Sequence, residues 1–203
     1  LHLCNKNMEK METTKITDSS KAKNDLLAEV CMAAKYEGQS IARDYPKYQT
    51  AYGNFPFELC TVLARSFADI GDIVRGRDLY RGGNNKRRQQ LKNNLKTIFG
   101  KIYDNLMEDL RKDLTKEEIE RRYGSDTENY FQLREDWWTA NRGTVWKAIT
   151  CSDRLGGNNY FRPTCNREKR TEGYCRCDGD QPNADVPNTD PPTYFDYVPQ
   201  YLR

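Results

Sequence analysis

The sequence predicts an all-α fold: a disulfide-linked helical bundle with long variable loops. In four stretches of the chain the apolar residues recur three to four positions apart, which is the spacing that gives a helix one buried face. Seven cysteines, four of them between 151 and 177, indicate disulfides that clamp a loop-rich region in an oxidising compartment. No internal repeat and no parallel-strand pattern is present, so a helical bundle is the predicted architecture.

The bundle is predicted to form around one core helix within residues 55 to 80. Asn54 offers an N-cap, Pro56 suits the first turn, where a missing N–H costs nothing, and Gly76 supplies a stop signal. The apolar residues of this stretch form one wide face for burial: Phe57, Cys60, Leu63, Ala64, Phe67, Ile70 and Val74.

The helix before this core stretch is predicted from Ser20 to about Tyr45, with Pro46 limiting its extension. Its apolar residues form a narrow stripe of heptad type: Leu27, Cys31, Ala34, Gly38, Ile41 and Tyr45. A third helix follows the turn at Gly82-Gly83 and continues to about Lys112. Its stripe consists of Leu91, Leu95, Ile98, Ile102, Leu106 and Leu110.

Two further helices are predicted, a short insertion between core elements and a fourth long helix. Thr115-x-x-Glu118 has the form of a capping box, which indicates a short separate helix over 115 to 123. A fourth long helix is predicted over 128 to 150 with both of its apolar faces covered. One face consists of Leu133, Trp137, Ala140, Thr144 and Ala148, and its neighbour of Trp138, Val145 and Ile149.

The whole chain, residues 1 to 203, is expected to be a single domain fragment. The helical core covers about 20 to 150, a cysteine-rich loop covers 151 to 192, and another helix starts within 193 to 203. Hydrophobic residues make up 36% of the chain and charged residues 31%, so a very polar surface is expected. The formal net charge of +3 by itself predicts no binding partner. With no run of about 18 apolar residues and no leader, any anchor or signal is expected outside this chain.

Candidate catalytic and metal-binding patterns are weak. The only histidine is His2, and Gly71-x4-Gly76 is followed by Arg77-Asp78 where a nucleotide-binding loop needs Lys-Ser/Thr. Asp69 and Asp72 are expected to be solvated helix charges, and the cysteine spacing lacks the paired pattern of a zinc site. No enzyme activity, cofactor, metal or nucleic-acid partner is therefore expected.

Two basic clusters are candidates for binding a polyanion such as a sulfated glycan, against the alternative of ordinary solvated charges. The first is a string at the start of the third helix: Lys86, Arg87, Arg88, Lys92 and Lys96. The second lies in the cysteine-rich loop: Arg167, Lys169 and Arg170. The helical spacing of Trp137, Trp138 and Trp146 favours core packing over a stacking platform for sugars or bases.

Three separated blocks of the sequence carry a family resemblance. They are ARSFADIGDIVRGRDLY (64 to 80), REDWWTANRGTVWKAITC (134 to 151) and PPTYFDYVPQYLR (191 to 203). In their residues, order and spacing, these blocks resemble the alpha class of Duffy-binding-like domains in the variant erythrocyte membrane proteins of the malaria parasite Plasmodium falciparum. The resemblance covers the whole chain and places it as the central helical subdomain of such a domain.

The resemblance implies adhesion and not catalysis. Such domains are displayed on the outer face of the infected red cell by a membrane-anchored, antigenically variable protein. Their implied partners are a host-cell receptor, or a sulfated or blood-group glycan, in cytoadhesion and rosetting, together with flanking domains of the same polypeptide. The alternative is a structural scaffold that positions a neighbouring receptor-binding domain. Binding residues are not fixed across the family, so the resemblance carries no receptor site over to this chain.

The resemblance also favours a disulfide pairing. It joins Cys31 to Cys151, provided that their helices are neighbours. Cys60 would then reach either Cys175 or Cys177, and Cys165 would take the other member of that pair. Cys4 is left over, and its partner is predicted to lie upstream of residue 1.

Overall fold

The computed structural model of the chain describes residues 7–52, 58–78, 86–108, 116–165, 168–182 and 190–203. These residues form five α-helices joined by turns and short 3-10 helices, and no strand is present among them. The all-α prediction is therefore confirmed. None of the helices in this described part is long and apolar enough to cross a membrane.

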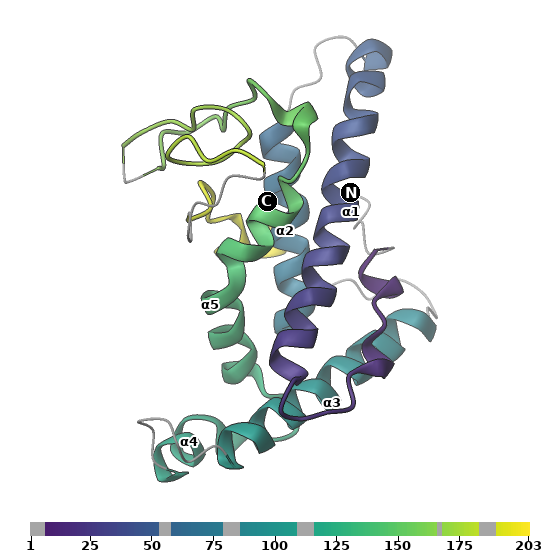
Figure 1. Ribbon diagram of the computed structural model, residues 1–203, viewed down its shortest axis with the longest axis vertical. Coiled ribbons are helices and arrows are strands. Elements are labelled where there is room, and N and C mark those ends of the chain that lie inside the picture. Colours follow the sequence, from purple (N-terminus) through teal and green to yellow (C-terminus); the bar gives the residue numbers. More distant parts are fainter. Residues whose placement is uncertain (1–6, 53–57, 79–85, 109–115, 166–167, 183–189) are drawn as a thin grey trace.

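Three helices run side by side along the long axis of the molecule, as Figure 1 shows: α1 (Ala22–Tyr52), α2 (Leu59–Arg75) and α5 (Phe131–Ile149). Helix α3 (Lys86–Glu108) crosses one end of this group, and the short helix α4 (Lys116–Tyr123) lies next to it. The core lies where α1, α2 and α5 meet, and α3 closes its lower end.

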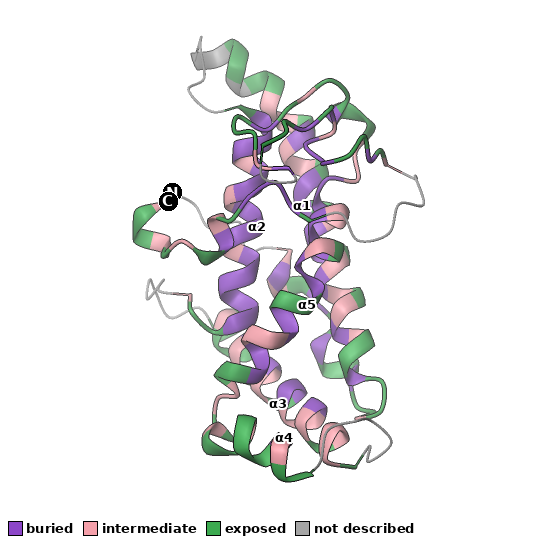
Figure 2. Ribbon diagram, turned by 90° about the vertical axis from the view of Figure 1, so that its left-hand side faces the viewer, coloured by how far each residue is buried: buried purple, intermediate pink, exposed green. Residues whose placement is uncertain are grey.

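Helix α2 is buried along almost its whole length, as expected for the organising element (Figure 2). Phe67 lies at the centre of the core, with its ring centroid 5.1 Å from that of Trp138 and 5.2 Å from that of Trp146. Gly76 ends the helix in the left-handed conformation, at φ 75°, as its sequence position predicts. Glu58 is the N-cap residue, and the predicted contributions of Asn54 and Pro56 lie outside the described residues.

Helix α1 extends beyond its predicted end. It continues through Pro46 to Tyr52, although a proline was expected to limit it. Proline removes only one backbone hydrogen bond from a helix interior, here the bond to the Ala42 carbonyl, and this single loss does not end the helix. The predicted capping residue Thr115 and the stripe residue Leu110 lie outside the described residues.

Helix α5 buries most of the residues that were predicted on its two apolar faces: Leu133, Trp137, Trp138, Val145 and Ile149. Ala140 and Thr144 are exposed, whereas Arg142 and Trp146 are buried, so all three tryptophans of the chain belong to the core. The prediction was wrong for Ala140 and Thr144, because apolar spacing could not show that the charged residue Arg142 faces the core. In the C-terminal segment, defined as residues 193–203, two 3-10 helices take the place of the expected helix start: Phe195–Tyr197 and Gln200–Leu202.

Helices α1 and α5 approach most closely at Gly38. A Cβ atom built on Gly38 would lie 1.8 Å from the backbone oxygen of Ile149, far inside any allowed contact. The obstructing atom belongs to the backbone, which cannot move aside as a side chain can. Gly38 therefore sets the distance and the register between these two helices, which run in the same direction (Figure 1).

The close contact at Gly38 predicts that alanine destabilises the chain at this position, although alanine usually stabilises a helix relative to glycine. Alanine normally stabilises a helix interior by up to about 1 kcal/mol relative to glycine. We expect Gly38→Ala instead to lower the free energy of unfolding by about 2 kcal/mol or more, because the helices must separate. The matched control is Gly100→Ala in α3, where the added Cβ meets only Tyr130 atoms at 3.5 Å or beyond and stability is unchanged or improved. Urea unfolding of both variants checks this, and equal stabilities would contradict the proposed close approach.

Candidate functional site

The cysteine-rich loop is anchored to the bundle by a disulfide between Cys60 of α2 and Cys175. A second disulfide, between Cys165 and Cys177, closes a shorter loop within the same region. This outcome is one of the two alternatives that the resemblance left open, so that part of the pairing is confirmed. Trp146 adds a hydrogen bond from its indole N–H to the Cys175 carbonyl, at 3.1 Å, which fixes the loop against α5 as well.

The expected Cys31–Cys151 disulfide is wrong for this structure, in which both cysteines are free and half-buried. The register between α1 and α5 explains why. Gly38 lies beside Ile149, and Cys31 comes seven residues before Gly38. Seven residues of helix are about 10 Å, whereas the Cα atoms of a disulfide lie within about 7 Å of each other. Cys151 lies beyond Ile149, on the far side from Cys31. Cys4 lies outside the described residues.

The C-terminal segment is held to the bundle by a buried ion pair. The carboxylate of Asp196 accepts two hydrogen bonds from the guanidinium of Arg142, each 2.8 Å long, and a third from the indole N–H of Trp138 at 2.9 Å. Arg142 also donates to the backbone carbonyl of Thr193 at 2.7 Å. Both charged side chains are buried, so each depends on the other for its stability.

The same network continues into α2. Arg75, almost fully buried, donates to the Asp72 carboxylate at 3.1 Å and to the backbone carbonyl of Asp196. Arg203 completes the network by pairing with Asp72 and, at 3.1 Å, with Asp69. The prediction that Asp69 and Asp72 are solvated helix charges is therefore wrong. The aspartates face a segment more than a hundred residues away in sequence, which helical spacing could not reveal.

Burial controls the ionisation of Asp69. Burial raises the pKa of its carboxyl to about 6, because the loss of solvent outweighs the attraction of Arg203. The neighbouring carboxylates of Asp72, Asp78 and Glu37 raise the pKa further. Burial likewise raises the pKa of Asp72, although Arg203 and Arg75 oppose this. The network thus binds protons in the folded state that an unfolded chain would release.

The first basic cluster divides between different sides of α3. At 100° per residue, Arg88, Lys92 and Lys96 follow one another on one flank, one turn apart, and we call these three residues the basic row. Arg87 points to the opposite flank and Lys86 away from the core. The five predicted residues therefore form a row of three and two separate cations.

The basic row lies on the open flank of α3. On the other flank, Asn94 donates to the hydroxyl of Thr13 at 2.8 Å and Lys101 donates to the backbone carbonyl of Ile16 at 2.6 Å, so the N-terminal segment covers that side. Lys96 is paired only loosely, with the strongly exposed Glu128 at 3.9 Å. Such a pair contributes little and is easily exchanged for another anion.

The second basic cluster lies far from the first. Lys169 and Arg170 are exposed in the cysteine-rich loop, where the backbones of Cys165 and Lys169 pair in a short antiparallel bridge. Arg167 lies outside the described residues. The loop and α3 are at opposite ends of the long axis (Figure 1), so the two clusters cannot form one continuous surface.

Comparison with known protein families decides the identity of the fold. The family model described as the Duffy binding domain matches residues 1–203, which is the entire chain. The chain belongs to this family. The resemblance seen in the three sequence blocks is thus confirmed. A comparison with curated protein sequences finds no match.

Solved structures of Duffy-binding-like domains are similar to this chain over almost its full length. The NTS-DBL1(alpha-1) domain of Plasmodium falciparum membrane protein 1 (PfEMP1), from the varO strain, is 38% identical with a TM-score of 0.67, and the match covers 99% of this chain and 40% of that one. The NTS-DBL1-alpha and CIDR-gamma double domain of the same strain is 39% identical, with a TM-score of 0.68 and coverage of 99% and 25%. The ICAM-1-binding PfEMP1 IT4var13 DBLbeta domain is 30% identical, with a TM-score of 0.64 and coverage of 100% and 39%. The chain thus spans about two-fifths of the two single-domain relatives.

Within the described ranges, no group of three or more His, Cys, Asp or Glu side chains could hold a metal ion. Sequence reasoning missed the buried residues Arg75, Arg142 and Asp196. The one available signal was their location inside the three blocks that carry the family resemblance.

The cysteine assignment predicts a simple labelling pattern. Burial raises the pKa of the Cys31 thiol to about 11, so roughly a thousandth of it is thiolate at pH 8. Native Cys31 should therefore react with iodoacetamide far more slowly than the same residue in the unfolded chain. Non-reducing peptide mapping should recover Cys60–Cys175 and Cys165–Cys177, and a peptide joining Cys31 to Cys151 would contradict the structure.

The raised pKa of Asp69 predicts a pH-dependent stability. In the folded state this carboxyl keeps its proton to about pH 6, whereas in the unfolded chain it loses it near pH 4. Its contribution to stability is complete below about pH 4 and is lost as the pH rises through 6. We expect the difference in unfolding free energy between the native chain and Asp69→Asn to fall by at most about 3 kcal/mol over this window.

Urea melts at intervals from pH 4 to 7 measure that difference. Asp44→Asn is the matched control, because hydrogen bonds from Arg43 and Lys47 hold the pKa of the Asp44 carboxyl below its usual range. Its contribution to stability is lost only as the pH falls below about 4, so the control difference should stay nearly constant from about pH 5 to 7. A flat or rising difference for Asp69→Asn would refute the assignment.

Proposed function

We propose that this chain is part of a host-cell adhesion module, displayed on the infected red cell through an anchor outside the chain. Its ligand at α3 is a sulfated glycan of the host-cell surface. Membership of the Duffy binding domain family supports the adhesive role. The similarity to a PfEMP1 domain whose structure is described as ICAM-1-binding supports it further.

The basic row carries the glycan part of the proposal. Arg88, Lys92 and Lys96 span eight residues of α3, which is about 12 Å, so their charges follow a line. A linear polyanion can contact successive cations along such a line without bending around the helix. Lys92 has no acidic partner among the described residues, and Lys96 has only the loose pair with Glu128.

The chemistry of the row also suits sulfate. The guanidinium of Arg88 can donate paired N–H groups to sulfate oxygens, as it does to phosphate, while the two lysines supply point charges. Because these side chains are at least partly exposed, salt should weaken their attraction as the screening length falls from about 8 Å at physiological salt to about 3 Å at 1 M. The buried network of Arg75, Arg142 and Arg203 cannot contribute, because its charges are already satisfied internally.

The proposal predicts that removing the basic row weakens heparin binding. The test variant changes Arg88, Lys92 and Lys96 to Gln, which keeps helix propensity while removing three charges. We expect it to elute from heparin resin at a lower salt concentration than the native chain. The matched control changes Arg162, Lys169 and Arg170 to Gln at the opposite end of the molecule, which removes the same charge and should elute nearly as the native chain does.

Circular dichroism establishes that each variant retains its fold. If both variants elute at the same salt concentration, the effect depends only on net charge, and the proposal that the basic row binds the glycan is refuted. A native chain that does not bind heparin resin at physiological salt would refute the proposal that the ligand is a sulfated glycan.

A parallel binding assay on red cells and endothelial cells tests adhesion itself. Failure to bind any of these cells would favour the scaffold role, in which a neighbouring domain of the polypeptide binds the receptor.

A further inference from the structure

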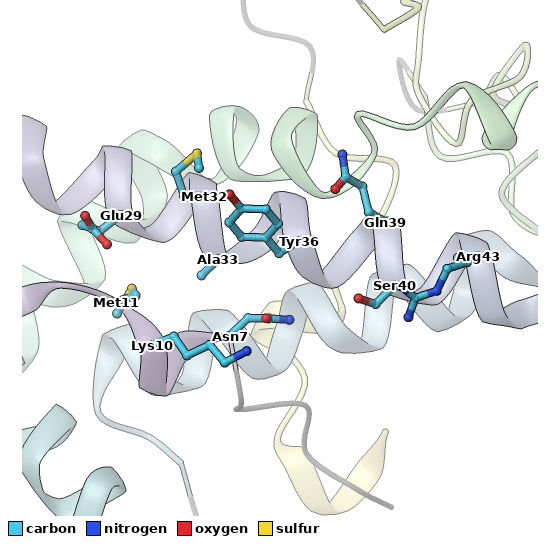
Figure 3. A pocket seen from close by; sticks show the side chains of 10 residues that line it. All are labelled: Asn7, Lys10, Met11, Glu29, Met32, Ala33, Tyr36, Gln39, Ser40 and Arg43. Atoms are coloured by element: carbon cyan, nitrogen blue, oxygen red, sulfur yellow. The ribbon is translucent and has the colours of Figure 1, made fainter.

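A groove runs along the outer face of α1, between this helix and the N-terminal segment (Figure 3). Its volume is about 380 Å³, and Lys10 and Met11 form the wall opposite α1. Met32 and Tyr36, one turn apart, are 45% and 51% exposed at its centre. Large apolar side chains with this exposure are frequent at sites that contact another protein.

The residues that α1 contributes to the groove repeat every seven positions. Glu29, Tyr36 and Arg43 occupy one heptad position, and Met32 and Gln39 occupy another. A seven-residue repeat keeps one stripe of a helix facing a partner helix over several turns. Helix α1 therefore has two such stripes, the buried one against the core and this second one on the surface.

The charges of the outer stripe are arranged symmetrically about Tyr36. Glu29 lies seven residues before it and Arg43 seven residues after it, and Figure 3 shows them at opposite ends of the groove. Arg43 and Lys47 share the single carboxylate of Asp44, so this end keeps an excess of positive charge. At the other end, one oxygen of Glu29 accepts the backbone N–H of Glu12 at 3.0 Å, and its second oxygen makes no hydrogen bond within the described chain.

We propose that this groove binds a second copy of the same chain, with the two α1 helices antiparallel about a two-fold axis at Tyr36. In that arrangement Glu29 of each copy faces Arg43 of the other, so two ion pairs form at once. Met32 faces Ser40 of the second copy, and the two Tyr36 rings meet at the axis. The self-complementary placement of acid and base is what a two-fold interface requires.

The shape of the surface agrees with the charge pattern. Met32 and Tyr36 line the groove on its α1 side and are both about half exposed, so each copy offers two apolar side chains to the other. The apolar area of the proposed interface is small, so we expect a weak dimer with a dissociation constant on the order of 10–100 µM. The proposal does not depend on the glycan function, because α1 and the basic row of α3 are separate surfaces.

Sedimentation velocity of the full 203-residue chain, from about 10 µM to about 1 mM, measures the association. Non-reducing gel electrophoresis of the same samples identifies any dimers that arise from disulfides between free cysteines. Tyr36→Lys places two like charges against each other at the axis and should weaken association by at least about tenfold. The matched control is Tyr201→Lys, at a position that is 75% exposed and is not among the residues that line the groove, which should associate as the native chain does.

A charge exchange tests the two-fold arrangement itself. Glu29→Lys alone and Arg43→Glu alone should each lose self-association, because each homodimer then opposes like charges. An equimolar mixture of the two variants should regain it, because lysine then faces glutamate and arginine faces glutamate across the interface. This recovery also shows that neither variant has lost its fold. A native chain that stays monomeric throughout, unchanged association of Tyr36→Lys, or a mixture that fails to associate would each overturn the proposal.

Discussion

The pair of Arg142 and Asp196 is the interaction on which the arrangement of the molecule depends. Asp196 is fully buried, and three hydrogen-bond donors surround its carboxylate. A buried charge left without its partner costs several kcal/mol, so removing either residue is expected to cost about 3–5 kcal/mol. The pair joins α5 to the C-terminal segment, and Arg75 extends the connection to α2. Three elements that are distant in sequence are thus held by one set of charges.

This network and one disulfide together attach the cysteine-rich loop to the helical bundle. The loop leaves the bundle at the end of α5 and returns to it at the C-terminal segment, whose position the network fixes. Between these two points, the Cys60–Cys175 disulfide attaches the loop to α2. Exposed residues such as Lys169 and Arg170 contribute little to stability, since surface substitutions usually change it by less than about 0.5 kcal/mol. Stability in this region therefore depends on the buried network and the disulfide, and little on these exposed cations.

The sequence was sufficient to predict the helices, because apolar spacing marks the buried face of each one. It was not sufficient to identify Asp72 and Arg142 as buried, since a charged residue in a helix is normally assigned to solvent and only its distant partner reverses that assignment. The prediction of a Cys31–Cys151 disulfide was wrong for a related reason. Periodicity shows which face of α1 is buried, but the axial register against α5 is set by the single contact of Gly38 with Ile149. In α3, the sequence was sufficient to show a cluster of cations. Helix geometry was needed to show that Lys86 and Arg87 lie on other sides of the helix than the basic row.

The two surfaces identified on α1 and α3 would reinforce each other. A single basic row would contact only a short stretch of polyanion, and physiological salt would weaken the attraction because the three side chains are partly exposed. Two chains paired through α1 would present two basic rows to the same ligand, and the second contact would then be intramolecular. Linked sites of this kind gain affinity through a high effective concentration and without new contacts, provided that the ligand can span both rows. A long, repetitive polymer meets that condition more readily than a compact protein epitope, so pairing of copies would favour extended glycans over single protein receptors.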